Sequence, residues 1–247
     1  MNEDLIHTNF TGREVCIYLP PSYATLVEGF PVVYVQDGGY LFREGLSKLK
    51  LMMRKKELRE VILVGIGSDN RNDEYTPWFA KAATAGFIDF GGQGINYLDF
   101  LANELKPYID GHYRTMCNPE NTAIVGASLG GLISIYAAYL HPQVFGRIAS
   151  ISGSFWYEDF IQFMRSTHIV HCGRRIYMDV GALEGTDKKN IQKDMVIKTQ
   201  QAYEVLLNQG FSLERCRFVI EEGADHEHSL FIRRFPIALQ WLFPTFV

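Results

Sequence analysis

Short, continuously apolar segments alternate with longer stretches of helical periodicity along most of this chain of 247 residues. We expect seven strands, at residues 15–19, 32–36, 61–65, 122–126, 148–152, 176–180 and 217–221. Five helical stretches lie between or after them, at residues 46–58, 95–109, 129–140, 191–209 and 230–243. Strands that are apolar without interruption are typical of parallel sheets covered on both faces. The pattern therefore predicts an α/β fold with a mostly parallel central sheet, helices on both faces and a hairpin-like start.

The composition is that of a soluble globular protein. Hydrophobic residues make up 47% of the chain and charged residues 21%, and the net charge is only -4. This balance leaves no electrostatic footprint for nucleic acid or an anionic membrane, and no apolar run approaches the ~20 residues of a membrane span. We expect a single domain over residues 1–247, with an N-terminal extension at 1–11 and small cap loops around 66–94 and 154–172.

The cysteines and the N-terminus indicate the compartment. Cys16, Cys117, Cys172 and Cys216 are scattered without metal-binding or redox spacing, so we expect reduced thiols. The first residues lack the basic and apolar regions of a signal peptide. The sequence thus predicts a cytoplasmic protein, and it specifies no oligomeric state.

The most informative segment reads strand, then Gly126-Ala-Ser128-Leu-Gly130, then an apolar helix. A nucleophilic serine needs such a sharp turn, with small neighbours that let strand and helix approach closely. The turn also leaves Ser128 at a helix N-terminus, where free amides favour a developing oxyanion. The bland alternative is a glycine-rich turn whose serine merely caps the helix. The flanking strand and helix favour Ser128 as a catalytic nucleophile.

A serine of ordinary pKa requires a base, and the base requires an orienting acid. In hydrolases with this turn the order along the chain is serine, acid, histidine. Glu184 follows the strand at 176–180, Asp187 lies slightly further along, and Asp179 within the strand is a poorer candidate. His226 and His228 both follow the last strand, so the residues alone leave the base open between them.

The two histidines could instead share a metal ion, because alternate residues of an extended segment point the same way. No third ligand is evident, so we expect neither a metal nor any other cofactor. The second oxyanion donor is expected on the turn after residues 32–36, where Asp37-Gly38-Gly39 lets the backbone bend sharply. We predict that the amides of Gly39 and Leu129 form the oxyanion hole.

Motifs outside this turn make the chain resemble the putative-esterase group of α/β-hydrolases over most of its length. That group includes esterase D, feruloyl esterases, mycolyltransferases and the enterochelin- and bacillibactin-type siderophore esterases. The matching motifs are Asp37-Gly38, Asn-Asp-Glu-Tyr-Thr-Pro-Trp at 72–78, Gly-Gly-Gln-Gly at 91–94, Tyr-Leu-Asp-Phe-Leu at 97–101, Glu-Leu-Lys-Pro-Tyr-Ile-Asp at 104–110, Tyr-Arg-Thr at 113–115, His141-Pro142 and Phe145-Gly146. The element at 74–78 is most similar to the siderophore-esterase branch.

The resemblance implies an α/β-hydrolase fold and a serine esterase. The family histidine stands ten residues before the proline of the last helix, and counting back from Pro236 gives His226. The family acid stands three residues after the glycine that ends its strand, which here is Glu184 after Gly181. One departure is Phe231, where the family usually has tryptophan. A second is the Gly-Tyr that follows Asp-Gly at 37–38, where many members carry a polar residue.

Aromatic and guanidinium side chains on the loops that should face the serine are the predicted substrate-binding residues: Tyr40, Arg71, Tyr75, Trp78 and Trp156. Such a lining suits a planar, anionic group such as a catecholate. We therefore expect a serine carboxylic-ester hydrolase of the siderophore-esterase type, whose substrate is a small ester such as a ferric catecholate trilactone. The alternatives are a short-chain acyl or feruloyl-type esterase, an acyltransferase, or a catalytically inactive hydrolase fold used for binding.

Overall fold

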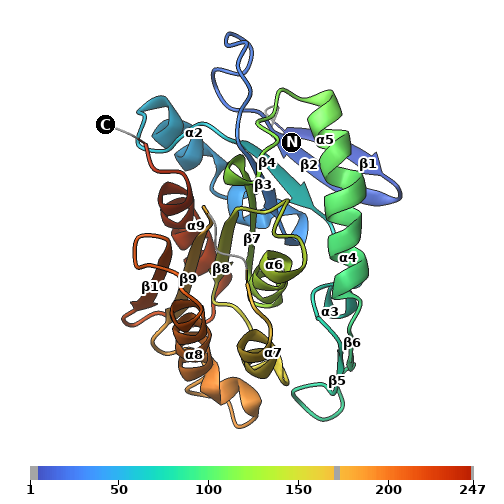
Figure 1. Cartoon of the computed structure of the whole chain (residues 1–247), viewed down its shortest axis with the longest axis vertical. Helices are drawn as coiled ribbons and strands as arrows, with labels where there is room; N and C mark the ends of the chain where they lie inside the picture. Colours follow the sequence, from blue (N-terminus) through green and yellow to red (C-terminus); the bar gives the residue numbers. More distant parts are fainter. Residues whose placement is uncertain (1–4, 170–172, 246–247) are drawn as a thin grey trace.

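A computed structural model describes residues 5–169 and 173–245. An eight-stranded sheet with the strand order β1-β2-β4-β3-β7-β8-β9-β10 runs through it (Figure 1). The strands are β1 Leu5–Phe10, β2 Arg13–Tyr18, β3 Val32–Val35, β4 Ile62–Ile66, β7 Thr122–Ala127, β8 Arg147–Ile151, β9 Arg175–Gly181 and β10 Cys216–Glu221. The β1–β2 and β2–β4 pairs are antiparallel, and all other neighbouring pairs are parallel. The predicted mostly parallel central sheet is confirmed.

All seven predicted strands form, but the pattern missed β1. Its side chains are exposed or half-buried, because β1 is an edge strand, so it lacks the apolar run that marks the central strands. Thr11 and Gly12 join it to β2, both with positive φ (51° and 88°), as a two-residue hairpin turn requires. Most of the expected N-terminal extension is thus part of the sheet. Residues 1–4 of that extension, Cys172 and the end of the expected cap loop at 154–172 lie outside the described residues.

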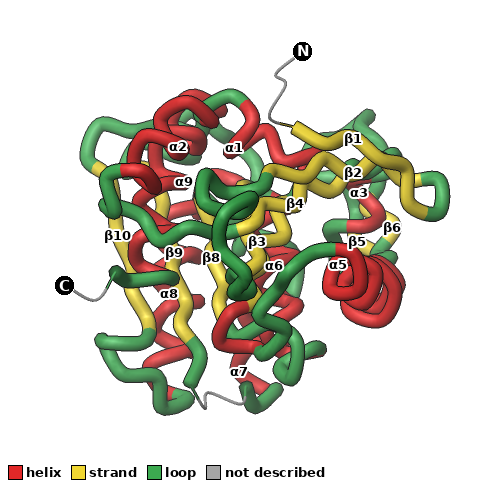
Figure 2. The backbone as a smooth tube through the Cα atoms, turned by 90° about the horizontal axis from the view of Figure 1, so that it is seen from above, coloured by secondary structure: helices red, strands yellow, loops and turns green. Residues whose placement is uncertain are grey.

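Helices cover both faces of the sheet (Figure 2). One layer contains α1 Tyr40–Arg43, α2 Leu46–Arg54 and α9 His228–Leu242. The other contains α4 Gly94–Phe100, the π-helical turn η2 Leu101–Leu105, α5 Lys106–His112, α6 Leu129–Leu140, α7 Phe160–Ser166 and α8 Met195–Asn208. Within β3, Val32 and Tyr34 pack toward the second layer, whereas Val33 and Val35 pack toward the first. Burial on both faces explains why the central strands are apolar without interruption.

The connections at the carboxyl ends of the parallel strands position the candidate site. They include the 3₁₀ turn η1 Asp37–Gly39 after β3, the short helix α3 Arg71–Glu74 after β4, and the segment containing η4 Ile191–Asp194 between β9 and α8. A small hairpin, β5 Phe79–Ala80 with β6 Phe90–Gly91, extends from the loop that was expected to form a cap. Ligands bind at this edge in open α/β sheets.

Two further observations concern the whole described chain. Cys16, Cys117 and Cys216 are free thiols. Among the described residues, no helix combines the length and the apolar character that crossing a membrane would require.

Candidate active site

Ser128 occupies a strained turn between β7 and α6. Its backbone angles are φ 57° and ψ −123°, in a region that residues other than glycine rarely adopt. The Ser128 amide donates a 3.0 Å hydrogen bond to Ile151 O in β8, which holds the turn against the sheet. A Cβ atom on Gly126 would lie 2.5 Å from the carbonyl of Gly130. The small residues around Ser128 are therefore required by the close approach of strand and helix.

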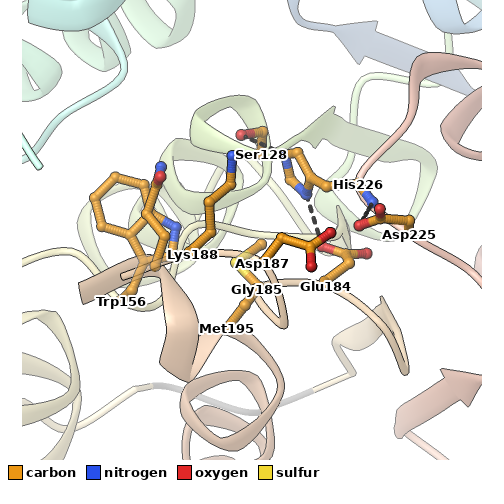
Figure 3. Close-up of a pocket in the computed structure, with 10 residues that line it drawn as sticks. Ser128, Trp156, Glu184, Gly185, Asp187, Lys188, Met195, Asp225 and His226 are labelled. Atoms are coloured by element: carbon orange, nitrogen blue, oxygen red, sulfur yellow. Dashed lines mark hydrogen bonds and ion pairs between the residues drawn. The ribbon is translucent and has the colours of Figure 1, made fainter. Parts of the chain in front are cut away.

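Three side chains from distant parts of the chain form a hydrogen-bonded row (Figure 3). His226, in the loop between β10 and α9, has its Nε2 atom 3.1 Å from Ser128 Oγ. Its Nδ1 atom lies 2.6 Å from Glu184 Oε2. The edge of Phe231 packs against the imidazole, with ring centroids 4.8 Å apart. This is the arrangement in which a carboxylate orients a histidine and the histidine accepts a proton from a serine.

Glu184 is buried and nevertheless ionised. Burial by itself raises the pKa of this carboxyl, but hydrogen bonds from His226, the Ser152 hydroxyl and the Gly181 amide outweigh burial and hold the pKa below its ordinary value. The Gly181 amide donates over 2.7 Å to Oε1, while Oε2 faces the imidazole. One carboxylate oxygen is thus anchored by the protein, and the other is free to orient His226.

A second buried ion pair lies beneath Glu184. Asp179 Oδ1 is 2.6 Å from Arg234 Nη1 and accepts a 3.1 Å hydrogen bond from the Ser152 amide. Burial raises the pKa of Asp179 to about 6 even though Arg234 opposes the shift. Arg234 also lies 3.6 Å from Glu184 Oε1 and 3.3 Å from Glu221 Oε2. Asp179 therefore faces Ser152 and Arg234 rather than the histidine.

The other two candidates for acid and base lie outside the hydrogen-bonded row. Asp187 is exposed at the rim of the cavity, although it follows Glu184 by only three residues. His228 begins α9, where its ring stacks on Tyr40 with centroids 4.9 Å apart and an interplanar angle of 26°. Of the open alternatives, the structure brings only Glu184 and His226 together with Ser128.

The two predicted oxyanion donors differ in their surroundings. Leu129 is the first residue of α6, so its amide stands outside the hydrogen bonds of the helix. Gly39 has φ 73°, and its amide donates a 3.0 Å hydrogen bond to Gln36 O within η1. A Cβ atom at Gly39 would lie 2.8 Å from Gly65 Cα, so only glycine fits there. The Gly39 amide could therefore donate to an oxyanion only if it shared its hydrogen with Gln36 O or if its hydrogen bond to Gln36 O broke.

Arg71 and Tyr75 support the loop after β3. Arg71 Nε is 2.7 Å from Asp37 Oδ1, and Arg71 Nη2 is 3.4 Å from Ala127 O beside the serine. The Tyr75 hydroxyl accepts a 2.9 Å hydrogen bond from the Asp37 amide, and Tyr75 is 0% exposed. Tyr75 therefore does not line the cavity beside Ser128: its hydroxyl is hydrogen-bonded to η1 and its ring lies in the core. Arg71 is half-exposed, but Asp37 already pairs its charge.

Trp78 belongs to an aromatic cluster rather than to the cavity beside Ser128. Its ring lies 5.7 to 6.2 Å from those of Tyr157, Phe160 and Phe163, measured between centroids. Its indole N–H donates a 3.1 Å hydrogen bond to Glu158 O. Trp78 therefore does not line the cavity beside Ser128, and its contact with substrate stays a prediction. The loop folds back on α7, so the indole is used for packing.

A cavity of about 220 Å³ opens beside Ser128, and of the five predicted substrate-binding residues only Trp156 lines it. Sequence reasoning missed its other lining residues, namely Gly185, Lys188, Gln192, Met195 and Asp225. It also missed Ser154, whose Oγ lies 3.3 Å from Ser128 Oγ. Figure 3 places Lys188 between Trp156 and His226. One feature of the sequence could have indicated four of them, Gly185, Lys188, Gln192 and Met195: they closely follow Glu184 in the chain.

The sheet order, the strained serine turn and the hydrogen-bonded row define a hydrolase of the α/β-hydrolase fold. The model of the family described as "Putative esterase" matches residues 10–242, so the chain belongs to this family of ester-cleaving enzymes. Serine esterase is accordingly its enzyme class.

The chain is similar to several proteins of this kind. It is 41% identical over 232 residues to the uncharacterized protein YbbA of Bacillus subtilis, covering 94% of this chain and 93% of that one. It is 26% identical over 222 residues to the ferri-bacillibactin esterase BesA of the same organism, covering 80% and 75%. The enterobactin esterase FES of Shigella flexneri shares the fold, with a TM-score of 0.78 at 17% identity, over 98% of this chain and 59% of that one.

Proposed function

We propose that this protein is a siderophore-esterase-like serine hydrolase, with Ser128, His226 and Glu184 as its catalytic residues. The observation that carries the proposal is the row of contacts from Ser128 Oγ to His226 Nε2 at 3.1 Å and from His226 Nδ1 to Glu184 Oε2 at 2.6 Å. This row starts at a strained turn and ends at an anchored carboxylate, as acyl transfer to a serine requires.

The geometry supports a two-step reaction. His226 accepts the proton of Ser128 as Oγ attacks the ester carbonyl, and Glu184 stabilises the imidazolium that results. The amide of Leu129 holds the oxyanion, and Gly39 shares its amide hydrogen between Gln36 O and the oxyanion. His226 then protonates the leaving alcohol. Water repeats the sequence on the acyl-enzyme and releases the acid.

The cavity suits one arm of an aromatic, anionic ester. Trp156 offers a ring for stacking, and the Lys188 ammonium offers a charge for a phenolate or catecholate oxygen. A volume of about 220 Å³ lies below the ~300–1,000 Å³ of pockets that enclose drug-sized ligands. A ferric catecholate trilactone therefore inserts one arm and keeps the rest outside. The names of two relatives, ferri-bacillibactin esterase and iron(III) enterobactin esterase, support a siderophore as the substrate.

Purified protein should be tested with 4-nitrophenyl acetate and with a tris-catecholate trilactone in its ferric and iron-free forms. We expect turnover of the acetate ester and opening of the trilactone, both abolished in Ser128→Ala. A serine-reactive phosphonate should label the parent protein but not Ser128→Ala. The matched control is Ser166→Ala, a serine at the end of α7 outside the cavity.

Any other result of these assays would support one of the alternative functions. Hydrolysis confined to short acyl esters, without trilactone opening, would make the protein a short-chain acyl esterase. Faster acyl transfer to an added alcohol than to water would make it an acyltransferase. Absence of both turnover and phosphonate labelling would leave a binding protein with a hydrolase fold.

We also propose that the chain works as a single hydrolase unit in the cytoplasm. The free thiols of Cys16, Cys117 and Cys216 support that location, because thiols persist in a reducing compartment.

A further inference from the structure

The segment that follows β8 contacts both ends of the hydrogen-bonded row. The Ser152 hydroxyl donates a hydrogen bond to Glu184 Oε1, and the Ser152 amide donates one to Asp179. Ser154, two residues further along, lies beside the nucleophile, with its Oγ atom 3.3 Å from Ser128 Oγ. Two serine hydroxyls of one short segment therefore reach the acid and the nucleophile. The proposed function gives no role to the second of them, Ser154.

The backbone fixes the place of Ser154. Its amide donates a 3.0 Å hydrogen bond to Ser128 O, and its carbonyl accepts a 3.0 Å hydrogen bond from the Tyr157 amide. Gly153, the residue before it, has no room for a side chain, because a Cβ atom there would lie 2.6 Å from the Phe155 ring. The Ser154 hydroxyl therefore lies beside Ser128 Oγ for reasons that do not depend on the contact between the two hydroxyls.

The Ser154 hydroxyl is buried against the nucleophile. The residue is 0% exposed, so its hydroxyl cannot turn to bulk water. Within residues 5–169 and 173–245, Ser128 Oγ is the one hydrogen-bond partner of Ser154 Oγ. A buried hydroxyl costs free energy unless it forms a hydrogen bond, so alanine would fill the same space at lower cost. The hydroxyl is therefore explained by its contact with Ser128.

A count of hydrogens gives the direction of this contact. A carboxylate only accepts, so the 2.6 Å contact with Glu184 places the hydrogen of the neutral imidazole on His226 Nδ1. The Nε2 atom of His226 is then an acceptor, and it takes the single hydroxyl hydrogen of Ser128 over 3.1 Å. Ser128 has no hydrogen left to donate to Ser154. Ser154 is therefore the donor, and Ser128 Oγ is the acceptor.

We propose that Ser154 is a further catalytic residue, which donates a hydrogen bond to Ser128 Oγ during the reaction. This inference rests on the proposed function, because it concerns the same nucleophile. The hydrogen bond keeps the Ser128 hydrogen directed to His226 before the attack. It then stabilises the negative charge that develops on Oγ as this hydrogen moves to Nε2, and again when Oγ leaves the acyl carbon in the second step. Ser154 keeps its own hydrogen, so the proton passes only between Ser128 and His226.

The test deletes one buried hydroxyl at a time. Ser154→Ala removes the donor to Ser128 Oγ. Its matched control is Ser150→Ala, which removes a β8 hydroxyl that is also 0% exposed and that has no hydrogen-bond partner within the described chain. Ser154→Ala should lower kcat and kcat/KM for 4-nitrophenyl acetate equally, by about 10- to 100-fold, because the hydrogen bond strengthens as Oγ becomes negative. Ser150→Ala should leave both constants unchanged.

A second measurement follows the nucleophile itself. Labelling by a serine-reactive phosphonate needs the same attack by Ser128 Oγ but no ester turnover. The labelling rate should therefore fall in Ser154→Ala by a factor similar to that in kcat, and it should not fall in Ser150→Ala. Urea unfolding of both variants checks that each is folded.

Unchanged turnover and labelling in Ser154→Ala, a loss confined to KM, or an equal loss in Ser150→Ala would overturn the role of Ser154 while leaving the esterase assignment intact. If the parent protein hydrolyses no ester, the esterase assignment fails instead. In that case the labelling rates decide the role of Ser154. Slower labelling of Ser154→Ala than of the parent supports it, whereas equal rates or no labelling at all overturn it.

Discussion

Arg71 and Asp37 form an ion pair, with Nε and Oδ1 2.7 Å apart, that joins the helix after β4 to the turn after β3. The same guanidinium lies 3.4 Å from Ala127 O, one residue before the serine. The pair therefore connects the two backbone segments that are expected to hold the oxyanion. We therefore propose that Arg71, which the sequence predicts to bind substrate, acts by positioning the turn that carries Gly39.

Arg71→Ala should lower kcat for 4-nitrophenyl acetate by about tenfold with little change in KM, because positioning of an oxyanion donor acts in the transition state. Arg71→Lys should recover only part of this loss, since lysine lacks the planar fork of arginine. The measurement is steady-state kinetics with the neutral acetate ester. A loss confined to KM for anionic esters would show that Arg71 binds substrate after all.

Ser128→Ala and His226→Ala should each lower kcat by about 10⁴-fold or more, and the double variant should lose little beyond either single one. The two side chains act together in one proton transfer. Once either is removed that transfer is lost, so removing the other lowers kcat little further. Kinetics of the three variants with one ester check this. Multiplicative losses would contradict the shared mechanism.

The acid can be assigned by comparing two neighbouring carboxylates. Glu184→Gln should lower kcat by about 10⁴-fold, because an amide leaves the imidazole in the wrong tautomer. Asp187→Asn should change KM rather than kcat, because Asp187 lies at the cavity rim without contact to His226. If kcat instead fell strongly in Asp187→Asn and little in Glu184→Gln, Asp187 would be the catalytic acid.

Lys188 should determine the preference for anionic substrates. Lys188→Ala is expected to raise KM for a ferric catecholate ester by about fivefold at low salt, with no such rise for 4-nitrophenyl acetate, and 0.5 M salt should reduce the difference. Kinetics at two ionic strengths measure it. The control is Lys189→Ala, the next lysine along the chain, which does not line the cavity. Equal effects on the charged and neutral esters would exclude charge recognition by Lys188.

Arg234 should stabilise the fold in a pH-dependent manner. Arg234→Met leaves Asp179 buried without its nearest cation, which should lower the free energy of unfolding by about 3–5 kcal/mol at pH 8. Burial raises the folded-state pKa of Asp179 from 3.8 to about 6, so the folded protein holds a proton that the unfolded chain releases. The contribution of Asp179 to stability therefore falls as the pH rises from about 4 to about 6.

Removing Arg234 should raise that pKa further, so the loss of stability should be smaller at pH 5, where Asp179 can take up a proton, than at pH 8. Urea unfolding at both pH values measures this difference. Arg233→Met is the matched control: its exposed ion pair with Glu221 should contribute no more than about 1 kcal/mol. A loss in Arg234→Met that does not change with pH would contradict the role of Asp179.

Local patterns predicted most of the fold. The serine turn is encoded within a few residues, where Gly126 and Gly130 leave room for strand and helix to approach. The central strands are apolar on both faces because helices cover both faces. The edge strand β1 escaped prediction because one exposed side removes the need for an apolar run.

The sequence by itself determined the central strands, the nucleophile turn and the short loops that carry Glu184 and His226, because each is marked by a pattern of residues that are neighbours along the chain. Only the tertiary structure decided which polar and aromatic side chains face the cavity. Tyr75 became a buried support because Asp37, 38 residues earlier, offers its amide. Arg71 was paired by the same residue, while Lys188 entered the cavity. Hydrogen bonds and ion pairs between distant segments form only when the chain folds. Local sequence patterns therefore do not predict them.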